Sequence, residues 1–430
     1  MNARRFVTKR SEDAPYVRRH KPDYQIVLYM GLLMLLGLVV MYAIGPQRAN
    51  VLNNVFGTDN YDSMYFFMKQ ILSLGIAVGV FLIVTLVIPF RLFLRYSGKI
   101  VMIGFIASAL LLLFGNILHV NEIAQCSLGA CRWFNIGPFG LQPAELLKFG
   151  VLIFSAGFLG TRAKQGLIND WSRTLAPMSL LVGSALVAIV VIQKDMGTGI
   201  TLGAMVATML FIAGLSYRFG FALLGVSLAI GTLFIISAPH RMERVLTYFN
   251  GDNHSVDVAG DYHIAHAKMA IGSGGLFGVG IGNSIEATGY LPEAVNDSVF
   301  AIMGETFGFV GLIAILAIFT GLLLRLLRIS DNLVDMRERI VVGGVFGWLA
   351  AHVILNIGAM TGLVPLTGIT LPLLSFGGTS MVFIAAALGL AFQLSRYTVF
   401  GSKIKDDEYE NSQRRRGVGR PRYSSRRRSA

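Results

Sequence analysis

The feature that most constrains this chain is a series of ten apolar stretches, each close to the length of a membrane span. About 20 consecutive apolar residues in a helix cross the hydrocarbon core of a bilayer. The stretches lie near 25–45, 66–89, 100–119, 141–160, 175–193, 197–215, 219–237, 298–324, 341–361 and 377–395. The sequence therefore predicts an all-α polytopic membrane protein with about ten transmembrane helices.

The composition excludes a water-soluble enzyme and a disordered chain. Charged residues make up 14% and hydrophobic residues 54%, whereas soluble domains carry roughly 25% charged residues. The mean hydropathy is +0.63. The polar residues 1–24 precede the first stretch and no small-residue cleavage site follows it, so we predict a span there and not a cleavable signal peptide.

The distribution of Lys and Arg predicts that both termini are cytoplasmic. With the N-terminus inside, all but eight of the 37 basic residues fall in inner segments, as the positive-inside rule requires. The eight are Arg48, Lys69, Arg132, Lys148, Lys194, Arg241, Arg244 and Lys268.

This orientation divides the chain into a basic cytoplasmic tail (1–24), a transmembrane domain (25–396) and a disordered polybasic cytoplasmic tail (397–430). The two tails carry most of the basic excess. We expect them to be attracted to anionic lipids and not to bind nucleic acid.

Two of the predicted outer connections are long: 120–140, and 238–297 between the seventh and eighth spans. Loops of this length in a compact protein are usually functional or disordered. The second contains a glycine-rich run, Gly272–Gly282, that lacks the preceding strand and the Lys-Ser/Thr of a P-loop. Close backbone packing at the membrane surface is the favoured interpretation, and a subsite for a lipid-linked phosphate is the alternative.

Ionisable residues at the predicted outer helix ends are candidates for function, because charges at membrane depth are costly. Glu145 and Lys148 are three residues apart and share one helix face, which favours a structural ion pair. Lys194 and Asp195 lie between the fifth and sixth spans.

Asp297 and Glu305 are eight residues apart at the start of the eighth span, again on one face. Asp297 could be a helix cap, a cation or proton site in a transporter, or a general base that takes a proton from a sugar hydroxyl. Outer cations would suit a pyrophosphate leaving group, where charge develops in the transition state. Composition alone does not choose between transport and glycosyl transfer.

Four groups of motifs occur in order along the chain. They are Arg132-Trp133 with Gln142-Pro143-Ala144-Glu145 and Lys148; Gln193-Lys194-Asp195-Met196-Gly197-Thr198; Gly272–Gly282 with Asn283-Ser284-Ile285 and Tyr290-Leu291-Pro292-Glu293-Ala294; and Asn356, Gly362, Pro365, Gly368 and Leu373–Ser380. Through them, residues 25–396 resemble the SEDS proteins, the FtsW/RodA/SpoVE family of ten-span bacterial cell-wall enzymes. The third group and the long tails are most similar to FtsW, the division branch.

The resemblance implies an inverting peptidoglycan glycosyltransferase that polymerises lipid II at the outer face of the bacterial cytoplasmic membrane, at the division septum. The growing glycan on undecaprenyl pyrophosphate would be the donor, and the C4 hydroxyl of the incoming GlcNAc would attack. Asp297 matches the essential aspartate of the family and would be the general base. The candidates for pyrophosphate binding are Arg132, Lys148, Arg241, Arg244 and Lys194. The candidates for supporting roles are Gln142, Glu145, Asp195, Glu293, Glu305, Ser375, Gly377 and Gly378.

The resemblance also implies partners: a class B penicillin-binding protein that acts as transpeptidase, and other division proteins. No cofactor is assigned, and a divalent cation, Mg²⁺ or Mn²⁺, shared between Asp297 and the pyrophosphate stays open. The competing functions are a lipid II flippase, a non-catalytic scaffold for the transpeptidase, and an ion-coupled transporter. The last is disfavoured because the sequence shows no internal repeat.

Several positions depart from the family pattern. Val295-Asn296-Asp297-Ser298 stands where the family usually has His-Thr-Asp-Phe, and Lys194 replaces a proline. Ala144, His266 and Phe376 also differ from the usual residues. The departures keep the proposed base and leave open a reduced or partner-dependent activity. Cys126 and Cys131 share an outer loop, where a disulfide and two free thiols are both open.

Overall fold

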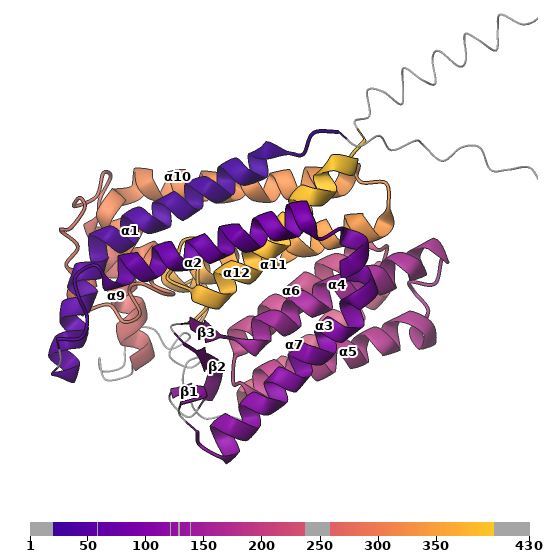
Figure 1. Cartoon of the computed structure of the whole chain (residues 1–430), viewed down its shortest axis with the longest axis horizontal. Coiled ribbons are helices and arrows are strands. Elements are labelled where there is room, and N and C mark those ends of the chain that lie inside the picture. The colour runs from indigo at the N-terminus through magenta and orange to yellow at the C-terminus, as the bar shows by residue number, and fades with distance from the viewer. Residues whose placement is uncertain are drawn as a thin grey trace, which may run out of the picture.

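The computed structural model describes residues 20–57, 59–120, 122–127, 130–137, 139–236 and 259–399. Long helices dominate it and run roughly along one another (Figure 1). They are α1 (Tyr24–Phe56), α2 (Tyr65–Leu82), α3 (Phe90–Leu111), α4 (Pro143–Lys164), α5 (Ala176–Leu186), α6 (Met196–Ile212), α7 (Tyr217–Ile236), α10 (Val299–Asn332), α11 (Met336–Met360) and α12 (Gly378–Leu394). Four wider π-helical turns extend three spans: η1 (Ile83–Val87) continues α2, η2 (Leu112–Ile117) continues α3, and η3 (Trp171–Leu175) and η4 (Val187–Ile192) flank α5.

Each of the ten predicted spans falls on one of these helices. Eight helical segments of the described chain, counted with their π turns, are long and apolar enough to cross a membrane. The apolar helix α6 has only 17 residues. The prediction of a polytopic all-α membrane protein is confirmed, and the count of ten spans stays a prediction.

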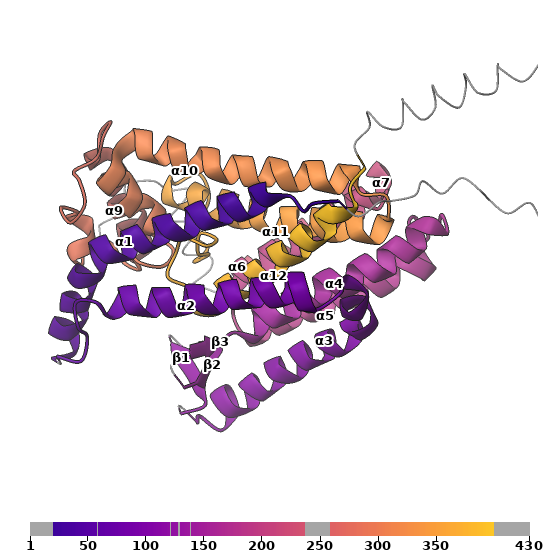
Figure 2. The ribbon, with the colours of Figure 1, turned by 45° about the horizontal axis from the view of Figure 1, so that its top comes forward.

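The two ends of the described chain meet at one end of the bundle, on the right in Figure 2. The backbone N–H of His20 donates to the carbonyl of Arg396 at 3.0 Å, and His20 Nε2 lies 2.9 Å from the carbonyl oxygen of Thr398. An even number of spans places both termini on the same side of a membrane. The contact therefore agrees with an even number of spans, and the assignment of this end to the cytoplasm stays a prediction.

The opposite end, called the sheet end here, carries helix α9 (Ala259–Ser273) and a small antiparallel sheet (Figure 1). The sheet has the order β1 (Ala124–Ser127), β2 (Ala130–Ile136) and β3 (Phe139–Leu141). The loop at 120–140 is thus structured, an exception to the predicted all-α fold. Cys126 and Cys131 face each other across β1 and β2 and form a disulfide, so the two thiols are not free.

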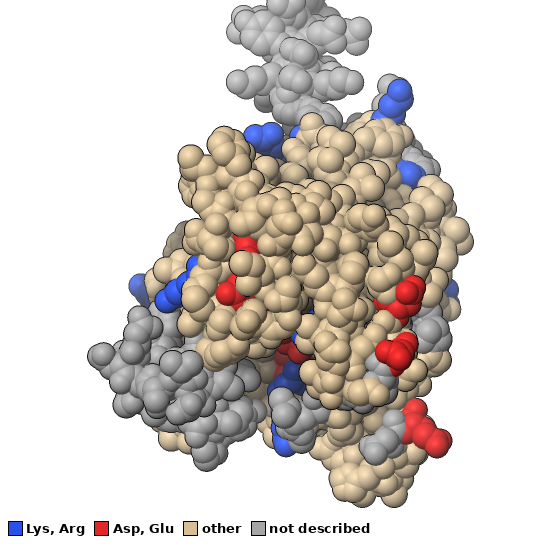
Figure 3. Space-filling model, turned by 90° about the vertical axis from the view of Figure 1, so that its left-hand side faces the viewer, with Lys and Arg blue, Asp and Glu red and all other residues tan. Residues whose placement is uncertain are grey.

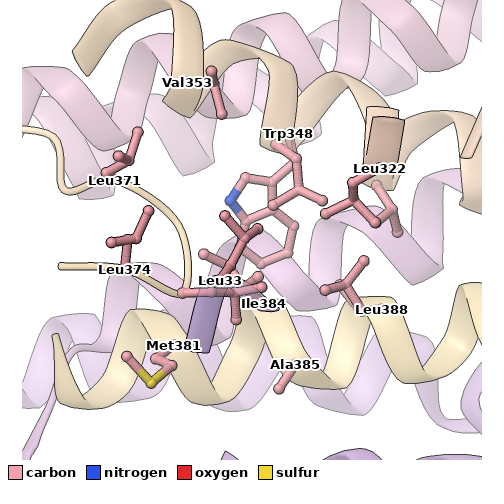
Figure 4. Close-up of a cluster of buried hydrophobic side chains, with 14 of the residues drawn as sticks. Leu33, Leu322, Trp348, Val353, Leu371, Leu374, Met381, Ile384, Ala385 and Leu388 are labelled. Atoms are coloured by element: carbon pink, nitrogen blue, oxygen red, sulfur yellow. The ribbon is translucent and has the colours of Figure 1, made fainter. Parts of the chain in front are cut away.

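Helix α11 lies at the centre of the packing, against α4, α6 and α10. Its glycines permit this close approach: a Cβ atom at Gly344 would lie 2.5 Å from Leu152 of α4, and one at Gly347 would lie 2.5 Å from Thr208 of α6. Trp348 fills the space between α11 and α12, beside Leu33 (Figure 4). The polar side chains of α11 therefore lie in a closely packed part of the bundle.

Candidate active site

Asp297 lies at the sheet end, directly before α10, and its side chain is buried. The segment before it is anchored by the buried side chains of Leu291 and Val295. Asn356 of α11 donates its Nδ2 to the carbonyl of Asp297 and to that of Ile369, both at 2.7 Å. The cap residue of α10 is Ser298, so Asp297 does not occupy the cap position that the alternative assigned to it.

A tight turn at Glu293 sets the course of the chain into Asp297. Glu293 has a positive φ of 48°. Its carbonyl accepts hydrogen bonds from the N–H groups of Asn296 at 2.9 Å and Ser298 at 3.3 Å, and its carboxylate accepts one from Asn296 Nδ2 at 2.5 Å. Val295, in turn, accepts a hydrogen bond from Phe376 N at 2.8 Å. The unusual Val295-Asn296 pair therefore has a structural use: one residue fills the core and the other closes the turn.

The loop between α11 and α12 lies against Asp297. Gly368 has φ +70°, and a Cβ atom there would lie 3.9 Å from Asp297 Oδ2. Ser375 Oγ accepts a hydrogen bond from Leu371 N at 2.8 Å. Gly377 is the cap residue of α12 and Gly378 its first residue. The predicted supporting residues Ser375, Gly377 and Gly378 thus shape this loop.

Glu145 and Lys148 form the ion pair that their spacing predicts, with Lys148 Nζ 2.8 Å from Glu145 Oε1. Both side chains are almost fully buried. Two residues of α11 complete the surrounding of the ammonium group: His352, with Nε2 at 3.3 Å, and Trp348, with its ring centroid at 4.5 Å. Neither residue is among those predicted from the sequence. A histidine inside an apolar span is itself a signal for a functional position.

One face of α11 connects Lys148 to Asp297. His352 and Asn356 are four residues apart, about one helical turn. His352 contacts Lys148, and Asn356 holds the backbone of Asp297. His352 Nδ1 also lies 3.3 Å from the carbonyl of Thr370, in the loop that surrounds Asp297. Figure 3 shows acidic and basic side chains inside a hollow at this end of the molecule.

A second polar group joins the sheet to the turn between α5 and α6. Asp195 caps α6 by accepting a hydrogen bond from Thr198 N at 2.9 Å, and it accepts another from Gln142 Nε2 at 2.9 Å. Arg132 of β2 donates Nη2 to the carbonyl of Lys194 at 2.9 Å. Gln142, Asp195, Arg132 and Lys194 therefore lie together. Their predicted roles toward a pyrophosphate stay predictions.

Glu305, another predicted supporting residue, anchors the outer loop. Its carboxylate accepts hydrogen bonds from Ser284 Oγ at 2.5 Å and Ile285 N at 2.8 Å. These contacts hold the short 3-10 helix η6 (Glu286–Thr288) against α10. Glu305 is therefore a structural anchor in this part of the chain.

The glycine-rich run packs into a break in α10. Gly308 interrupts the helix with φ 67° and ψ −168°. Val279 N donates to Glu305 O at 2.9 Å, and Gly280 N to Thr306 O at 3.1 Å. A Cβ atom at Gly278 would lie 2.2 Å from Thr306 O, so a larger residue does not fit. These contacts support close backbone packing and leave those N–H groups engaged with α10, not with a phosphate.

Two predicted pyrophosphate ligands, Arg241 and Arg244, lie outside the described residues. In the part of the chain that the structure describes, no three His, Cys, Asp or Glu side chains gather as metal ligands would. A divalent cation at Asp297 therefore stays a prediction. Asp297 and Lys148 are linked through α11, by Asn356 and His352, and their catalytic and binding roles stay predictions.

The fold and this site define a polytopic helical membrane protein with buried, partnered charges at one end of its bundle. Residues 24–399 match the family model of the cell cycle proteins FtsW, RodA and SpoVE. The chain belongs to this family, the SEDS proteins. Its sequence is FtsW-like, as predicted from the motifs.

Relatives match over most of their length. Stage V sporulation protein E of Bacillus subtilis (strain 168) is 32% identical over 385 residues, which cover 89% of this chain and 99% of that protein. The probable peptidoglycan glycosyltransferase FtsW of Nitrosomonas europaea is 29% identical and covers 95% of this chain and 98% of its own length. The corresponding protein of Aliivibrio salmonicida is 33% identical, with 86% and 88% covered.

Solved structures share the fold. The rod shape determining protein RodA of Thermus thermophilus matches with a TM-score of 0.61 and 24% identity, over 88% of this chain and 98% of that one. A chain of a peptidoglycan synthase complex, solved to explain how polymerization and crosslinking are coordinated, matches with a TM-score of 0.67 and 23% identity, over 87% and 98%.

Proposed function

We propose that this protein polymerises lipid II into glycan strands at the outer face of the bacterial cytoplasmic membrane, as the septal peptidoglycan glycosyltransferase of its cell. The observation that carries the proposal is the position of Asp297. Asp297 is buried and its backbone is held by Asn356 of α11, which lies one helical turn from His352, the α11 residue that contacts Lys148. The names of the FtsW relatives support the same class of reaction.

In this reaction Asp297 would be the general base. Its carboxylate takes the proton of the C4 hydroxyl on the GlcNAc of the incoming lipid II. That oxygen forms a bond to the anomeric carbon of the donor, while the bond from this carbon to the pyrophosphate oxygen breaks. Undecaprenyl pyrophosphate leaves with the bonding electrons, and the configuration at the anomeric carbon is inverted. General-base catalysis of this kind contributes about 10²–10⁴-fold to a rate.

The cations near the site would stabilise the leaving group. Negative charge grows on the pyrophosphate as the bond breaks, and fixed positive groups in a water-poor site stabilise that charge. Lys148 is the best placed of the described candidates because it is buried beside the helix that holds Asp297. Arg132 and Lys194 are further candidates, and Arg241 and Arg244, which lie outside the described residues, stay candidates from the sequence.

The test is lipid II polymerisation by the purified protein, with and without its cognate class B transpeptidase. Wild type, Asp297→Ala and Asp297→Asn are compared at equal, folded amounts. The Asn variant keeps the shape of the side chain and removes the base, so both variants should lose activity by at least about 100-fold. If either variant polymerises as well as wild type, the assignment of the base is wrong. If wild type makes no glycan even with the partner, a flippase or scaffold becomes the better function.

The partner and the septal role belong to the same proposal. A polymerase alone makes uncrosslinked strands, and the fold match to a chain of a peptidoglycan synthase complex supports association with a crosslinking enzyme. Depletion of the protein should block septation while elongation continues, and a fluorescent fusion should localise to midcell. Growth of the cell as a widening sphere on depletion would instead indicate an elongation role.

A further inference from the structure

Lys148 has two contacts in addition to its ion pair with Glu145, and together they show how its ammonium group is held. An ammonium group carries three N–H donors and no acceptor. The structure offers the group three partners: Glu145 Oε1 at 2.8 Å, His352 Nε2 at 3.3 Å and the Trp348 ring at 4.5 Å. One partner comes from α4 and two from α11.

The neighbours of His352 determine where its proton lies. Trp348 Nε1, which can only donate, points to His352 Nε2 at 3.2 Å, and so does the ammonium of Lys148. Nε2 must therefore be an acceptor. On the other side of the ring, Nδ1 lies 3.3 Å from the carbonyl oxygen of Thr370, which can only accept. Nδ1 must therefore carry the hydrogen.

We propose that His352 is a positioning residue that, as the neutral Nδ1–H tautomer, holds Lys148 in place and couples it to the loop beside Asp297. In a doubly protonated ring, Nε2–H would face two other donors, Trp348 Nε1 and Lys148 Nζ. The ring would also place a second positive charge beside the ammonium group. The neutral ring instead adds an acceptor without adding charge. The ring then adds no second positive charge beside Lys148, and Glu145 is the carboxylate that pairs with the ammonium among the described residues.

The coupling runs through α11 and the following loop. His352 and Asn356 bind adjacent carbonyls of that loop, those of Thr370 and Ile369. Asn356 at the same time holds the backbone of Asp297. One rigid helix thus fixes the spacing between the proposed base and the proposed pyrophosphate ligand. The catalytic part of this inference rests on the proposed function, whereas the tautomer and the contact with Lys148 do not.

The first test is independent of activity. The protein is labelled with ¹⁵N-histidine, and His352→Gln identifies the His352 signals by difference. We expect one protonated nitrogen, Nδ1, and an unprotonated, hydrogen-bonded Nε2 at neutral pH. A proton on Nε2, alone or in addition to Nδ1, would overturn the proposal.

The second test is a double-mutant cycle on thermal unfolding in detergent, with Lys148→Met, His352→Leu and both together. Residues in direct contact give non-additive effects. We expect the shift in Tm of the double variant to be smaller than the sum of the single shifts. Additive shifts would show that the two side chains do not interact. Thermal unfolding can be measured whether or not the protein is active.

The third test separates positioning from mere filling of space. In His352→Gln, the amide oxygen replaces Nε2 as acceptor, so polymerisation should remain within about threefold of wild type, while His352→Leu should lose at least about tenfold. Both variants must be folded and both are measured beside wild type. Equal losses in the Gln and Leu variants, or full activity of His352→Leu, would overturn the proposal. A wild type that polymerises nothing would reject the proposed function, and the first two tests would still decide the role of His352.

Discussion

At the scale of single residues, the site is governed by the cost of burying polar groups. A buried charge is tolerated when it is paired and hydrogen-bonded. Lys148 has three partners, and the carboxylate of Glu145 has one oxygen on Lys148 and a second that accepts no hydrogen bond from the described residues. Loss of Lys148 would therefore leave Glu145 without its hydrogen-bond partner among the described residues, whereas loss of Glu145 would leave Lys148 with two partners.

This asymmetry predicts the effect of removing the cation. Lys148→Met leaves a buried carboxylate without its counter-charge and should cost about 3–5 kcal/mol of unfolding free energy. Adding Glu145→Gln removes the orphaned charge, so the double variant should be more stable than Lys148→Met alone. Thermal unfolding in detergent compares the three proteins. A double variant less stable than the single one would contradict the pairing.

Asn356 should be sensitive for another reason. One side-chain amide serves the buried carbonyls of Asp297 and Ile369. Asn356→Ala leaves both without this donor, at about 1–3 kcal/mol for each unsatisfied group. We expect a lower Tm together with a loss of polymerisation, because Asp297 is no longer fixed. The matched control is Asn332→Ala, a partly exposed asparagine whose side chain donates to one carbonyl of its own helix, and its Tm should barely change.

At the scale of elements, the break in α10 determines how the outer loop is held. The helix opens at Gly308, and the glycine-rich run supplies N–H groups to the carbonyls of Glu305 and Thr306. A membrane helix tolerates such a break where neighbouring backbone satisfies the freed groups. Glycine is required here because the two backbones touch.

Three alanine substitutions separate the causes. Gly278→Ala combines a positive φ of 82° with a collision against Thr306 O, whereas Gly282→Ala has a positive φ of 85° and open space. Gly272→Ala has open space and no unusual φ. The positive φ alone costs about 1–2 kcal/mol, so the loss of Tm should rank Gly278 above Gly282 above Gly272. Equal effects at Gly278 and Gly282 would mean that the run does not pack closely.

The start of α11 makes a second prediction at this scale, at the end where the described termini meet. Asp335 caps the helix through Arg337 N at 2.9 Å and lies 3.2 Å from Lys164 Nζ. Burial raises the pKa of the Asp335 carboxyl, but the Arg337 N–H and the Lys164 ammonium lower it more, and the net pKa is below its ordinary value. A lowered pKa in the folded state stabilises the fold above the unfolded pKa, near 3.9.

That contribution is lost as the pH falls through the folded pKa. Asp335→Asn should therefore be slightly less stable than wild type at pH 7, and the difference should vanish in strong acid. Asp335→Ala also loses the cap and should cost about 1 kcal/mol at either pH. Thermal unfolding of the three proteins between pH 7 and strong acid, about pH 2, checks both statements. A wild-type advantage over Asp335→Asn that grows in acid would contradict the sign.

At the scale of the whole molecule, the bundle has two chemically different ends. The described chain starts and finishes at one of them, and the sheet and α9 occupy the other (Figure 1), where Figure 3 shows charged side chains in a hollow. The disulfide lies at the end that the charge distribution places outside the cell, where thiols are commonly oxidised. The two observations support one orientation.

Cysteine labelling tests that orientation. The native cysteines are joined in a disulfide and should not react with a maleimide. Tyr290→Cys, at the sheet end, should react with a membrane-impermeant maleimide on intact spheroplasts. Asp331→Cys, at the opposite end, should react only after lysis. Both positions are exposed, at 54% for Tyr290 and 70% for the Asp331 side chain, so the reverse labelling would invert the topology.

The predictions from sequence succeeded where the bilayer imposes a local rule. Apolar stretches became helices because a span must satisfy its own backbone hydrogen bonds, and the i, i+3 spacing of Glu145 and Lys148 became an ion pair because helix geometry fixes that neighbourhood. The outer loop at 120–140 was not predicted to be a sheet. Its strands depend on pairing partners within a short loop and on the disulfide. No alternating pattern of apolar and polar residues predicts them from the sequence.

By itself, then, the sequence determined the class of protein, its helices and the identity of the candidate base, since these follow from local composition, spacing and motifs. Only the tertiary structure decided which charges meet. Lys148 and His352 are 204 residues apart, and Asp297 and Asn356 are 59 apart. Such contacts arise from how α4, α10 and α11 pack. Packing depends on the shapes of whole helix faces, which a single segment of sequence does not contain.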